Sequence, residues 1–401
     1  MMRFLLLIFC ICLLFPVHAK AANKVSPRLY KALKKTETLI ANKSYQLAEQ
    51  KLQGMLADVK KQSYGHAIVL RSLSSVYALK GQYQQASDAL ATCLALNVLP
   101  KNQHKQALLN LGQLYMAIDQ YAKAIRILEP YLIENPKQAV EINVLVANAY
   151  AQLKHYRKSL SYIEKAIAAS KKPKEAWYQL NLALFFELKK YASAADLLNK
   201  LIQVYPDKKT YWDQLSSVYQ QLKHYKKAVS VKHLAYKKGF LDTEKSLLNL
   251  ANLLLYIHSP YKAAHLIKNE LAHKHIKSNS KNWETLANAW TMAKEFEHAI
   301  NALEVASKLN PKGSLYQRLG QIHVEQENWK LAIASLNQAL NKGGLKNTGA
   351  TYLLLGMSYY EIKEIKRAKQ SFLKASKYRK NKKSALQWLQ YMKVASLNIT
   401  P

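Results

Sequence analysis

The side chains with the clearest capacity for metal chemistry are two histidines in the sequence AHKHIK, His273 and His275. Imidazole nitrogens bind Zn²⁺ and Cu²⁺ readily. Residues two positions apart, however, lie on opposite faces of a helix or on the same face of a strand. The spacing therefore favours a polar linker over a metal site, and we expect no metal and no cofactor in this chain.

Signatures of catalysis do not occur in the sequence. It contains no P-loop, no GxSxG turn and no glycine-rich phosphate loop. A hydrolase acting on cell-wall polymers would need a pair of carboxylates or a nucleophile beside a base, and the sequence presents neither constellation. We therefore expect a chain without enzymatic activity and name no catalytic residue.

The first residues have the layout of a secretory signal. Met-Met-Arg precedes the apolar stretch FLLLIFCICLLF at 4–15, and Pro-Val-His-Ala follows it. These twelve apolar residues are too few to cross a bilayer, which takes about 20 in a helix. We predict a signal peptide over residues 1–22, cleaved after Ala19, Ala21 or Ala22, and a mature protein located in the periplasm.

Cysteine use agrees with that prediction. Cleavage would remove Cys10 and Cys12 and leave Cys93 as the only thiol. No disulfide can then form within the mature chain, so its stability has to come from a packed core. The composition, 49% hydrophobic with 11 Gly and 10 Pro, suits such a core.

The charge of the chain is strongly positive. It has 60 Lys and Arg against 25 Asp and Glu, a formal net charge of +35. Such a charge often indicates nucleic-acid binding, but an exported chain rarely meets nucleic acid. Anionic lipid, an envelope polyanion or an acidic protein is the better partner, and a solubilising surface is the alternative. The densest basic run comprises Lys363, Lys366, Arg367, Lys369, Lys374, Lys377, Arg379, Lys380, Lys382 and Lys383.

The two decapeptides QLKHYRKSLS (152–161) and QLKHYKKAVS (221–230) show that the chain repeats itself. In each of them, Tyr is followed three residues later by a small residue. An aromatic residue or Ile followed by a small residue at this distance recurs at intervals of 33 to 38 residues. The small residues are Ala48, Ala86, Ala124, Ser159, Ala194, Ala228, Ala264, Ala299, Ala332 and Ala368.

These units resemble the tetratricopeptide repeat, a helix–turn–helix of about 34 residues. One unit matches the pattern with Trp283, Leu286, Ala287, Trp290, Ala299, Leu303 and Pro311. The resemblance implies an all-α fold, a right-handed superhelical solenoid of about ten helix–turn–helix units with a C-terminal capping helix. The implied units lie near 29–62, 67–100, 105–138, 140–173, 175–208, 209–242, 245–278, 280–313, 313–346 and 349–382.

The predicted organisation is a signal peptide at 1–22, a solenoid at 23–382, and a capping helix with a tail at 383–401. The sequence SALQWLQYMKVAS (384–396) would cap the solenoid with Leu386, Leu389 and Met392, which share one helical face.

The unit pattern also assigns a place to three side chains that could otherwise suggest a site. Cys93 falls on the buried side of a second helix, so we expect a packed and inert thiol. His155 and His224 fall in the turn between the two helices of a unit, where we expect solvated side chains.

A binding groove follows from the resemblance, because tetratricopeptide arrays line a concave surface with their first helices. The equivalent positions here mix amides and hydroxyls with a few aromatic anchors, which suits an extended peptide or an inserted helix. They include Gln113, Asn148, Gln152, Phe186, Ser217, Gln220, Gln221, Tyr256, Asn288, Gln321 and Tyr360.

The whole layout is similar to bacterial periplasmic tetratricopeptide-repeat proteins encoded beside TonB, ExbB and ExbD. This similarity implies an interaction scaffold accessory to TonB-type energy transduction for outer-membrane nutrient uptake, with ExbD, TonB or an accessory membrane subunit as partner. The alternative is an envelope-biogenesis or secretion adaptor whose basic edge contacts anionic lipid or polysaccharide.

Overall fold

The computed structural model describes residues 25–134 and 139–397, so the predicted signal peptide at 1–22 lies outside the described residues. Within these ranges the chain forms 21 helices and no strand. The first helices of successive pairs are α1 (Pro27–Ala41), α3 (Tyr64–Leu79), α5 (Lys101–Ala117), α7 (Ala139–Gln152), α9 (Glu175–Glu187), α11 (Lys209–Gln221), α13 (Glu244–Tyr256), α15 (Ser280–Met292), α17 (Gly313–Glu325) and α19 (Thr348–Glu361). The second helices are α2 (Tyr45–Asp58), α4 (Tyr83–Ala95), α6 (Tyr121–Glu134), α8 (Tyr156–Ala169), α10 (Tyr191–Val204), α12 (Tyr225–Lys237), α14 (Pro260–Ala272), α16 (Phe296–Leu309), α18 (Trp329–Lys342) and α20 (Ile365–Ser376). A final helix, α21 (Lys382–Leu397), follows the last pair.

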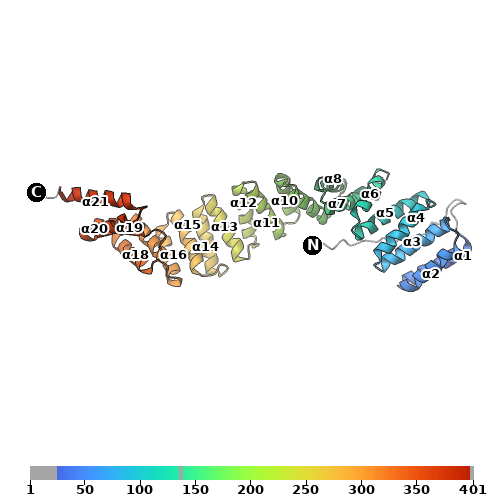
Figure 1. Cartoon of the computed structure of the whole chain (residues 1–401), viewed down its shortest axis with the longest axis horizontal. Coiled ribbons are helices and arrows are strands. Elements are labelled where there is room, and N and C mark those ends of the chain that lie inside the picture. Colours follow the sequence, from blue (N-terminus) through green and yellow to red (C-terminus); the bar gives the residue numbers. More distant parts are fainter. Residues whose placement is uncertain (1–24, 135–138, 398–401) are drawn as a thin grey trace. The chain divides into compact units, whose positions relative to one another are not determined.

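The chain divides into two compact units, one up to Leu197 and one from Leu198 onwards. Consecutive helices pack on one another from α1 to α9 in the first unit and from α11 to α21 in the second (Figure 1). The prediction of an all-α solenoid of helix–turn–helix units with a C-terminal capping helix is confirmed. None of the helices in the described ranges combines the length and apolarity that a membrane crossing requires.

Side-chain caps mark the start of several helices. The Ser63 hydroxyl accepts a hydrogen bond from the backbone N–H of His66 at 3.1 Å. Thr243 accepts from the N–H of Ser246 at 3.2 Å, and the Ser246 side chain accepts in turn from the N–H of Thr243 at 3.3 Å. Such caps satisfy backbone donors that the first turn of a helix leaves unpaired.

Small residues bring the two helices of a pair close together. A Cβ atom added at Gly112 in α5 would lie 2.6 Å from a methyl carbon of Leu128 in α6. In the second unit, the Ser216 hydroxyl of α11 donates to the carbonyl of Ala228 in α12 at 3.0 Å. The ten repeated small residues of the sequence pattern are all fully buried, so they too lie where helices pack closely.

The repeated Lys-His of the two decapeptides forms a helix-ending turn. Lys154 and Lys223 adopt positive φ values of 60° and 59°. The N–H of His155 then donates to the carbonyl of Tyr150 at 2.9 Å, which is the long hydrogen bond of a Schellman motif. Both His155 and His224 are exposed, so the expectation of solvated turn residues is confirmed.

The same geometry occurs at every joint between the two helices of a pair in the described chain. One residue with positive φ lies two positions before each second helix. These residues are Lys43, Gly81, Asp119, Lys154, Lys189, Lys223, His258, Lys294, Glu327 and Lys363.

We expect glycine at these joints to stabilise the fold. Lys154→Gly and Lys189→Gly relieve the contact between Cβ and the backbone at positive φ, and each should raise the free energy of unfolding by about 0.5–1 kcal/mol. Glu164→Gly, at an exposed position inside α8, should instead lower it by about 1 kcal/mol. Urea unfolding measures both effects, and equal losses at the two kinds of position would contradict the turn assignment.

Basic residues of the second helices cover tyrosines of the first helices. In four pairs the cation lies eight residues after the tyrosine and between 5.1 and 5.7 Å from its ring centroid. The pairs are Lys123 with Tyr115, Lys158 with Tyr150, Lys227 with Tyr219, and Arg367 with Tyr359. Part of the positive charge therefore serves packing within the repeats.

The capping helix α21 closes the second unit. Trp388 stacks on Phe372 of α20 with a centroid distance of 5.3 Å, and Met392 is buried. The prediction that Leu386 belongs to the packed face is wrong, because this side chain is 47% exposed. Ala385, which is fully buried, takes the inward position one residue earlier.

Candidate functional site

The predicted groove positions of the first unit lie on neighbouring first helices. Gln113 is on α5, Asn148 and Gln152 are on α7, and Phe186 is on α9. Because α5 contacts α7 and α7 contacts α9, these positions belong to adjacent helices. Gln152 is exposed, whereas Gln113, Asn148 and Phe186 are half-buried.

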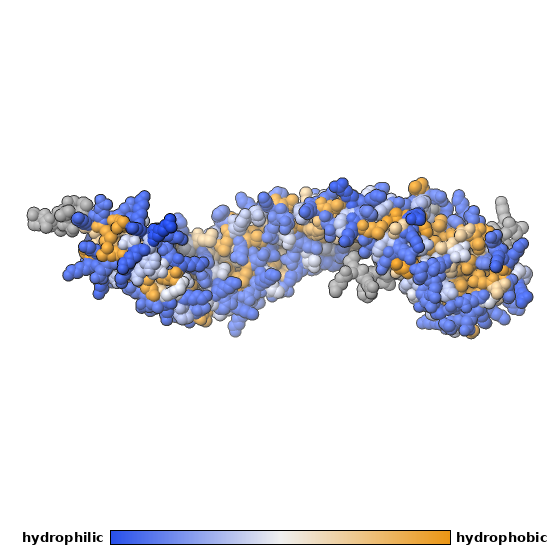
Figure 2. All heavy atoms as spheres, viewed as in Figure 1, coloured by the Kyte–Doolittle hydropathy of each residue, from blue (hydrophilic) through white to orange (hydrophobic). Residues whose placement is uncertain are grey.

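The predicted groove positions of the second unit also lie on first helices. They are Ser217, Gln220 and Gln221 on α11, Tyr256 on α13, Asn288 on α15, Gln321 on α17 and Tyr360 on α19. Ser217, Gln221, Tyr256, Asn288 and Gln321 are exposed. Figure 2 shows small groups of apolar side chains (orange) among hydrophilic ones (blue) on the visible face of each unit.

Three of these side chains hydrogen-bond to their own helix. Asn148, Ser217 and Gln220 each donate to the carbonyl four residues earlier, at 2.7, 2.8 and 3.3 Å respectively. A ligand would compete with these bonds. The exposed Gln152, Gln221, Asn288 and Gln321 are therefore better placed to meet a partner.

Tyr360 lies in a different environment from the other predicted groove residues, because the capping helix packs against it. Its ring lies 5.7 Å from that of Trp388 and 5.9 Å from that of Tyr391. A hydrogen bond with Tyr391 raises the pKa of the Tyr360 phenol. Tyr360 therefore packs against α21, in addition to occupying a predicted groove position.

Tyr256 is the most accessible aromatic residue among the predicted positions. Its side chain is 59% exposed, and its ring centroid lies 4.3 Å from that of Tyr225. A hydrogen bond with Tyr225 raises the pKa of the Tyr256 phenol, so the phenol stays neutral at physiological pH. The pair forms an aromatic platform at the end of α13.

An open pocket of about 540 Å³ surrounds this platform. We call it the Tyr256 pocket, and its lining residues are Lys223, His224, Tyr225, Lys226, Lys227, Tyr256, Ile257 and His258. It combines three ammonium groups with two phenols and two imidazoles, and no acidic residue is among these lining residues. Such a surface suits a carboxylate-bearing segment with an apolar or aromatic side chain.

The sequence-based interpretation identified Tyr256 but missed this pocket. It assigned His224 and the neighbouring lysines to a solvated turn, and the backbone does form a turn there. The pocket arises because this turn of one repeat meets the end of the first helix in the next repeat. Applying the repeat period to both segments together would have placed Tyr225 beside Tyr256.

The ten predicted basic residues, which lie in and beside α20 and at the start of α21, are all exposed. Arg367 pairs with Glu364 at 2.8 Å. Lys363 lies 5.9 Å from the ring of Tyr360, and Lys374 lies 5.5 Å from the ring of Tyr352. The segment therefore presents a cationic surface to solvent, with some side chains held over aromatic rings.

Cys93 has the environment expected for an inert thiol. It is fully buried in α4, and its Sγ lies 3.1 Å from the carbonyl oxygen of Ala67, to which it donates. Burial raises the pKa of the thiol to about 11, so little thiolate is present near neutral pH.

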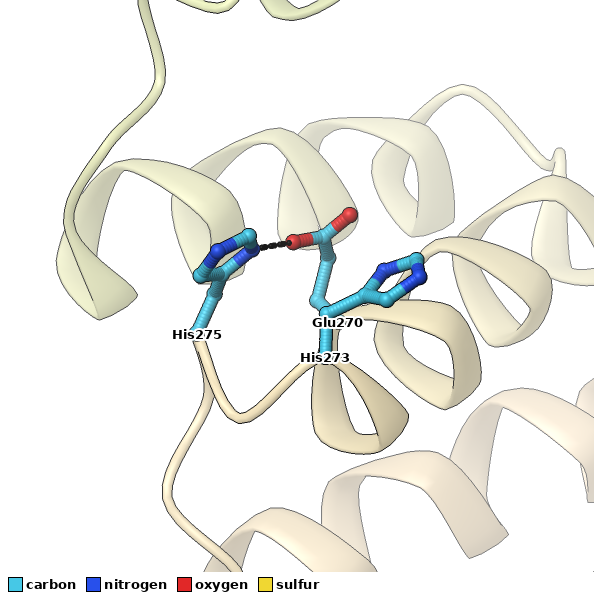
Figure 3. A group of neighbouring side chains, drawn as sticks. All are labelled: Glu270, His273 and His275. Atoms are coloured by element: carbon cyan, nitrogen blue, oxygen red, sulfur yellow. Dashed lines mark hydrogen bonds and ion pairs between the residues drawn. The ribbon is translucent and has the colours of Figure 1, made fainter.

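His273 and His275 have a neighbour that the sequence-based interpretation did not include. Glu270 in α14 is buried, and its Oε2 lies 2.7 Å from Nδ1 of His275 (Figure 3). Its other oxygen, Oε1, accepts a hydrogen bond from the Tyr236 hydroxyl at 2.5 Å. Glu270 lies three residues before His273, a spacing that brings these two side chains to the same side of a helix.

Comparisons with known proteins agree with the fold. Models of the tetratricopeptide repeat match residues 107–138, 146–208 and 350–382. These segments therefore carry tetratricopeptide repeats, and the packing of consecutive helix pairs is typical of a tetratricopeptide-repeat solenoid. No curated protein matches the chain significantly.

Several solved structures are similar at low identity. A tetratricopeptide repeat protein from Parabacteroides merdae is 14% identical, with 77% of this chain and 100% of that chain covered and a TM-score of 0.40. MamA from Desulfovibrio magneticus RS-1 is 18% identical, with 46% and 99% covered and a TM-score of 0.39. The C-terminal part of a TPR repeat-containing protein from Cytophaga hutchinsonii is 13% identical, with 69% and 95% covered and a TM-score of 0.39.

Proposed function

We propose that this chain is a non-enzymatic scaffold that binds a protein segment along its first helices. Tetratricopeptide repeats generally mediate protein–protein interaction. The observation that carries the proposal is the Tyr256 pocket, where an exposed aromatic pair meets Lys223, Lys226 and Lys227. Aromatic anchors surrounded by charge of one sign are typical of sites that select a complementary, here acidic, partner.

The proposed setting is the periplasm, in a TonB-type energy-transduction system. Two sequence features support it: the short apolar stretch at 4–15 behind Arg3, and the similarity to periplasmic repeat proteins encoded beside TonB, ExbB and ExbD. ExbD, TonB or an accessory membrane subunit would occupy the groove, and outer-membrane nutrient uptake would be the process served.

Two measurements in the native cell test this setting. Alkaline phosphatase fused after residue 60 should be active, since the enzyme matures only outside the cytoplasm. Purification after mild crosslinking should then recover ExbD or TonB with the chain. An inactive fusion would exclude the periplasm, and recovery of other envelope proteins alone would exclude the TonB system while leaving the scaffold role.

The alternative function, an envelope-biogenesis or secretion adaptor, is favoured by one observation. The ten basic side chains between Lys363 and Lys383 are all exposed. Anionic lipid head groups attract such clusters, with about 1 kcal/mol for each Lys or Arg near the surface.

We expect neutralisation of this surface to weaken membrane binding. Replacing Arg379, Lys380 and Lys383 by Gln should lower partitioning onto phosphatidylglycerol vesicles by about two orders of magnitude, because three attractions are lost. Replacing the exposed Lys171, Lys172 and Lys174 by Gln serves as the matched control and should have a smaller effect. Sedimentation with vesicles measures both, and retention that persists in 1 M salt would contradict an electrostatic contact.

A further inference from the structure

Three side chains outside the proposed groove come together at the C-terminal end of α14. One possible donor atom from each of Glu270, His273 and His275 lies within 4.8 Å of the others. Glu270 is 5% exposed, whereas both histidines are exposed (Figure 3). We propose that this cluster binds a divalent transition-metal ion, Zn²⁺ above all.

The backbone explains how two histidines at this spacing come to one place. The helix ends at Ala272 with His273 as its C-cap, and Lys274 adopts a positive φ of 63°. The chain then turns back, so that the N–H groups of His275 and Ile276 both donate to the carbonyl of Glu270, at 3.0 and 3.1 Å. Ile276 is buried and holds the turn in place. The objection from helical spacing does not apply, because His275 lies beyond the helix.

The carboxylate of Glu270 is oriented before any ion arrives. The Tyr236 hydroxyl, on α12, donates to Oε1 at 2.5 Å, while Oε2 faces His275. A donor that orients a ligating carboxylate in this way is common around protein metal sites.

The donor set selects the class of ion. Two imidazoles and one carboxylate suit Zn²⁺, Cu²⁺ or Ni²⁺, whereas Mg²⁺ and Ca²⁺ prefer oxygen ligands alone. Tetrahedral zinc with bonds of about 2.1 Å places its ligands roughly 3.4 Å apart. The exposed ring of His273 can close the remaining distance by rotating about its side-chain bonds.

One electrostatic contribution favours binding of a cation by this cluster, and another opposes it. The carbonyl end of α14 favours a cation. The formal net charge of +35 opposes one, so binding has to rest on these three ligands. With three protein ligands, a fourth coordination position remains for water or for a side chain of a bound partner.

Titration of the purified, untagged chain with Zn²⁺ in a calorimeter tests the proposal. We expect one site, weakened at least tenfold by His273→Ala, His275→Ala or Glu270→Gln. Tyr236→Phe should weaken it about tenfold, through the loss of the orienting donor alone. His155→Ala and His224→Ala are matched controls at exposed turn positions, and neither should change the affinity.

Co²⁺ provides a second readout, because tetrahedral coordination gives strong visible absorption. This absorption should appear with the unaltered chain and disappear in His273→Ala and His275→Ala. Both replacements affect exposed side chains, so far-ultraviolet circular dichroism should remain unchanged. The proposal is overturned if the unaltered chain does not bind Zn²⁺, or if all three ligand variants bind it with the affinity of the unaltered chain.

Discussion

Replacing Trp290 by Ala should lower the free energy of unfolding of the second unit by about 3–5 kcal/mol. Trp290 in α15 is 2% exposed and is among the largest fully buried side chains of the described chain. Its ring contacts Tyr261 and His265 of α14 and His298 of α16, with centroid distances of 5.8, 5.1 and 4.8 Å. Truncation would open a cavity between three helices that belong to two consecutive repeats.

Urea unfolding and hydrogen exchange together measure this effect. Met292→Ala is the matched control, because Met292 lies on the same helix and is 53% exposed. It should change stability by less than about 0.5 kcal/mol. Since each repeat of a solenoid contacts only its neighbours, faster exchange should concentrate in α13 to α18. A loss of similar size in both variants would contradict the assigned packing.

Replacing Tyr256 by Ala should lower the affinity for the protein partner by about 2 kcal/mol, or roughly thirtyfold. The side chain is 59% exposed, so its truncation removes contact area without opening the core. Lys226→Glu should weaken binding as well, mainly through slower association and a weaker dependence on salt, because it reverses a charge at the pocket.

Leu234→Ala is the control for this second prediction. Leu234 belongs to α12, which also contributes Tyr225 to the pocket, and is 51% exposed, but it does not line the pocket. Surface plasmon resonance, with the partner immobilised on the surface, measures the affinity of all three variants. If Leu234→Ala weakens binding as much as Tyr256→Ala, the partner does not use the pocket.

The repeat architecture was predictable because its causes are local and periodic. Close packing of two helices requires small residues at fixed positions of the repeat, as Gly112 on a first helix and the fully buried Ala228 on a second helix show. The turn of each joint likewise depends on a few neighbouring residues. The repeated sequence QLKHY therefore indicates the same turn at Lys154 and at Lys223. Ten repetitions of such a pattern make the fold evident in a single sequence.

The sites were less predictable because they depend on where one segment meets another. The Tyr256 pocket joins a turn of one repeat to a helix end of the next. The cluster of Glu270, His273 and His275 depends on a backbone reversal at Lys274 that helical periodicity does not describe. Leu386 was misplaced for a similar reason, since a terminal helix has no following repeat to define its inner face.

The central claim is that the first helices of the repeats bind a protein partner beside Tyr256. The most direct test is photo-crosslinking in living cells, with a photoreactive residue at Tyr256 or Gln221 and, as controls, at Leu234 or Leu331. All four positions are exposed, and the two controls lie on second helices. The claim predicts a discrete adduct with one envelope protein from Tyr256 and Gln221 and none from the controls. No adduct from either groove position, or the same adducts from all four, would contradict it.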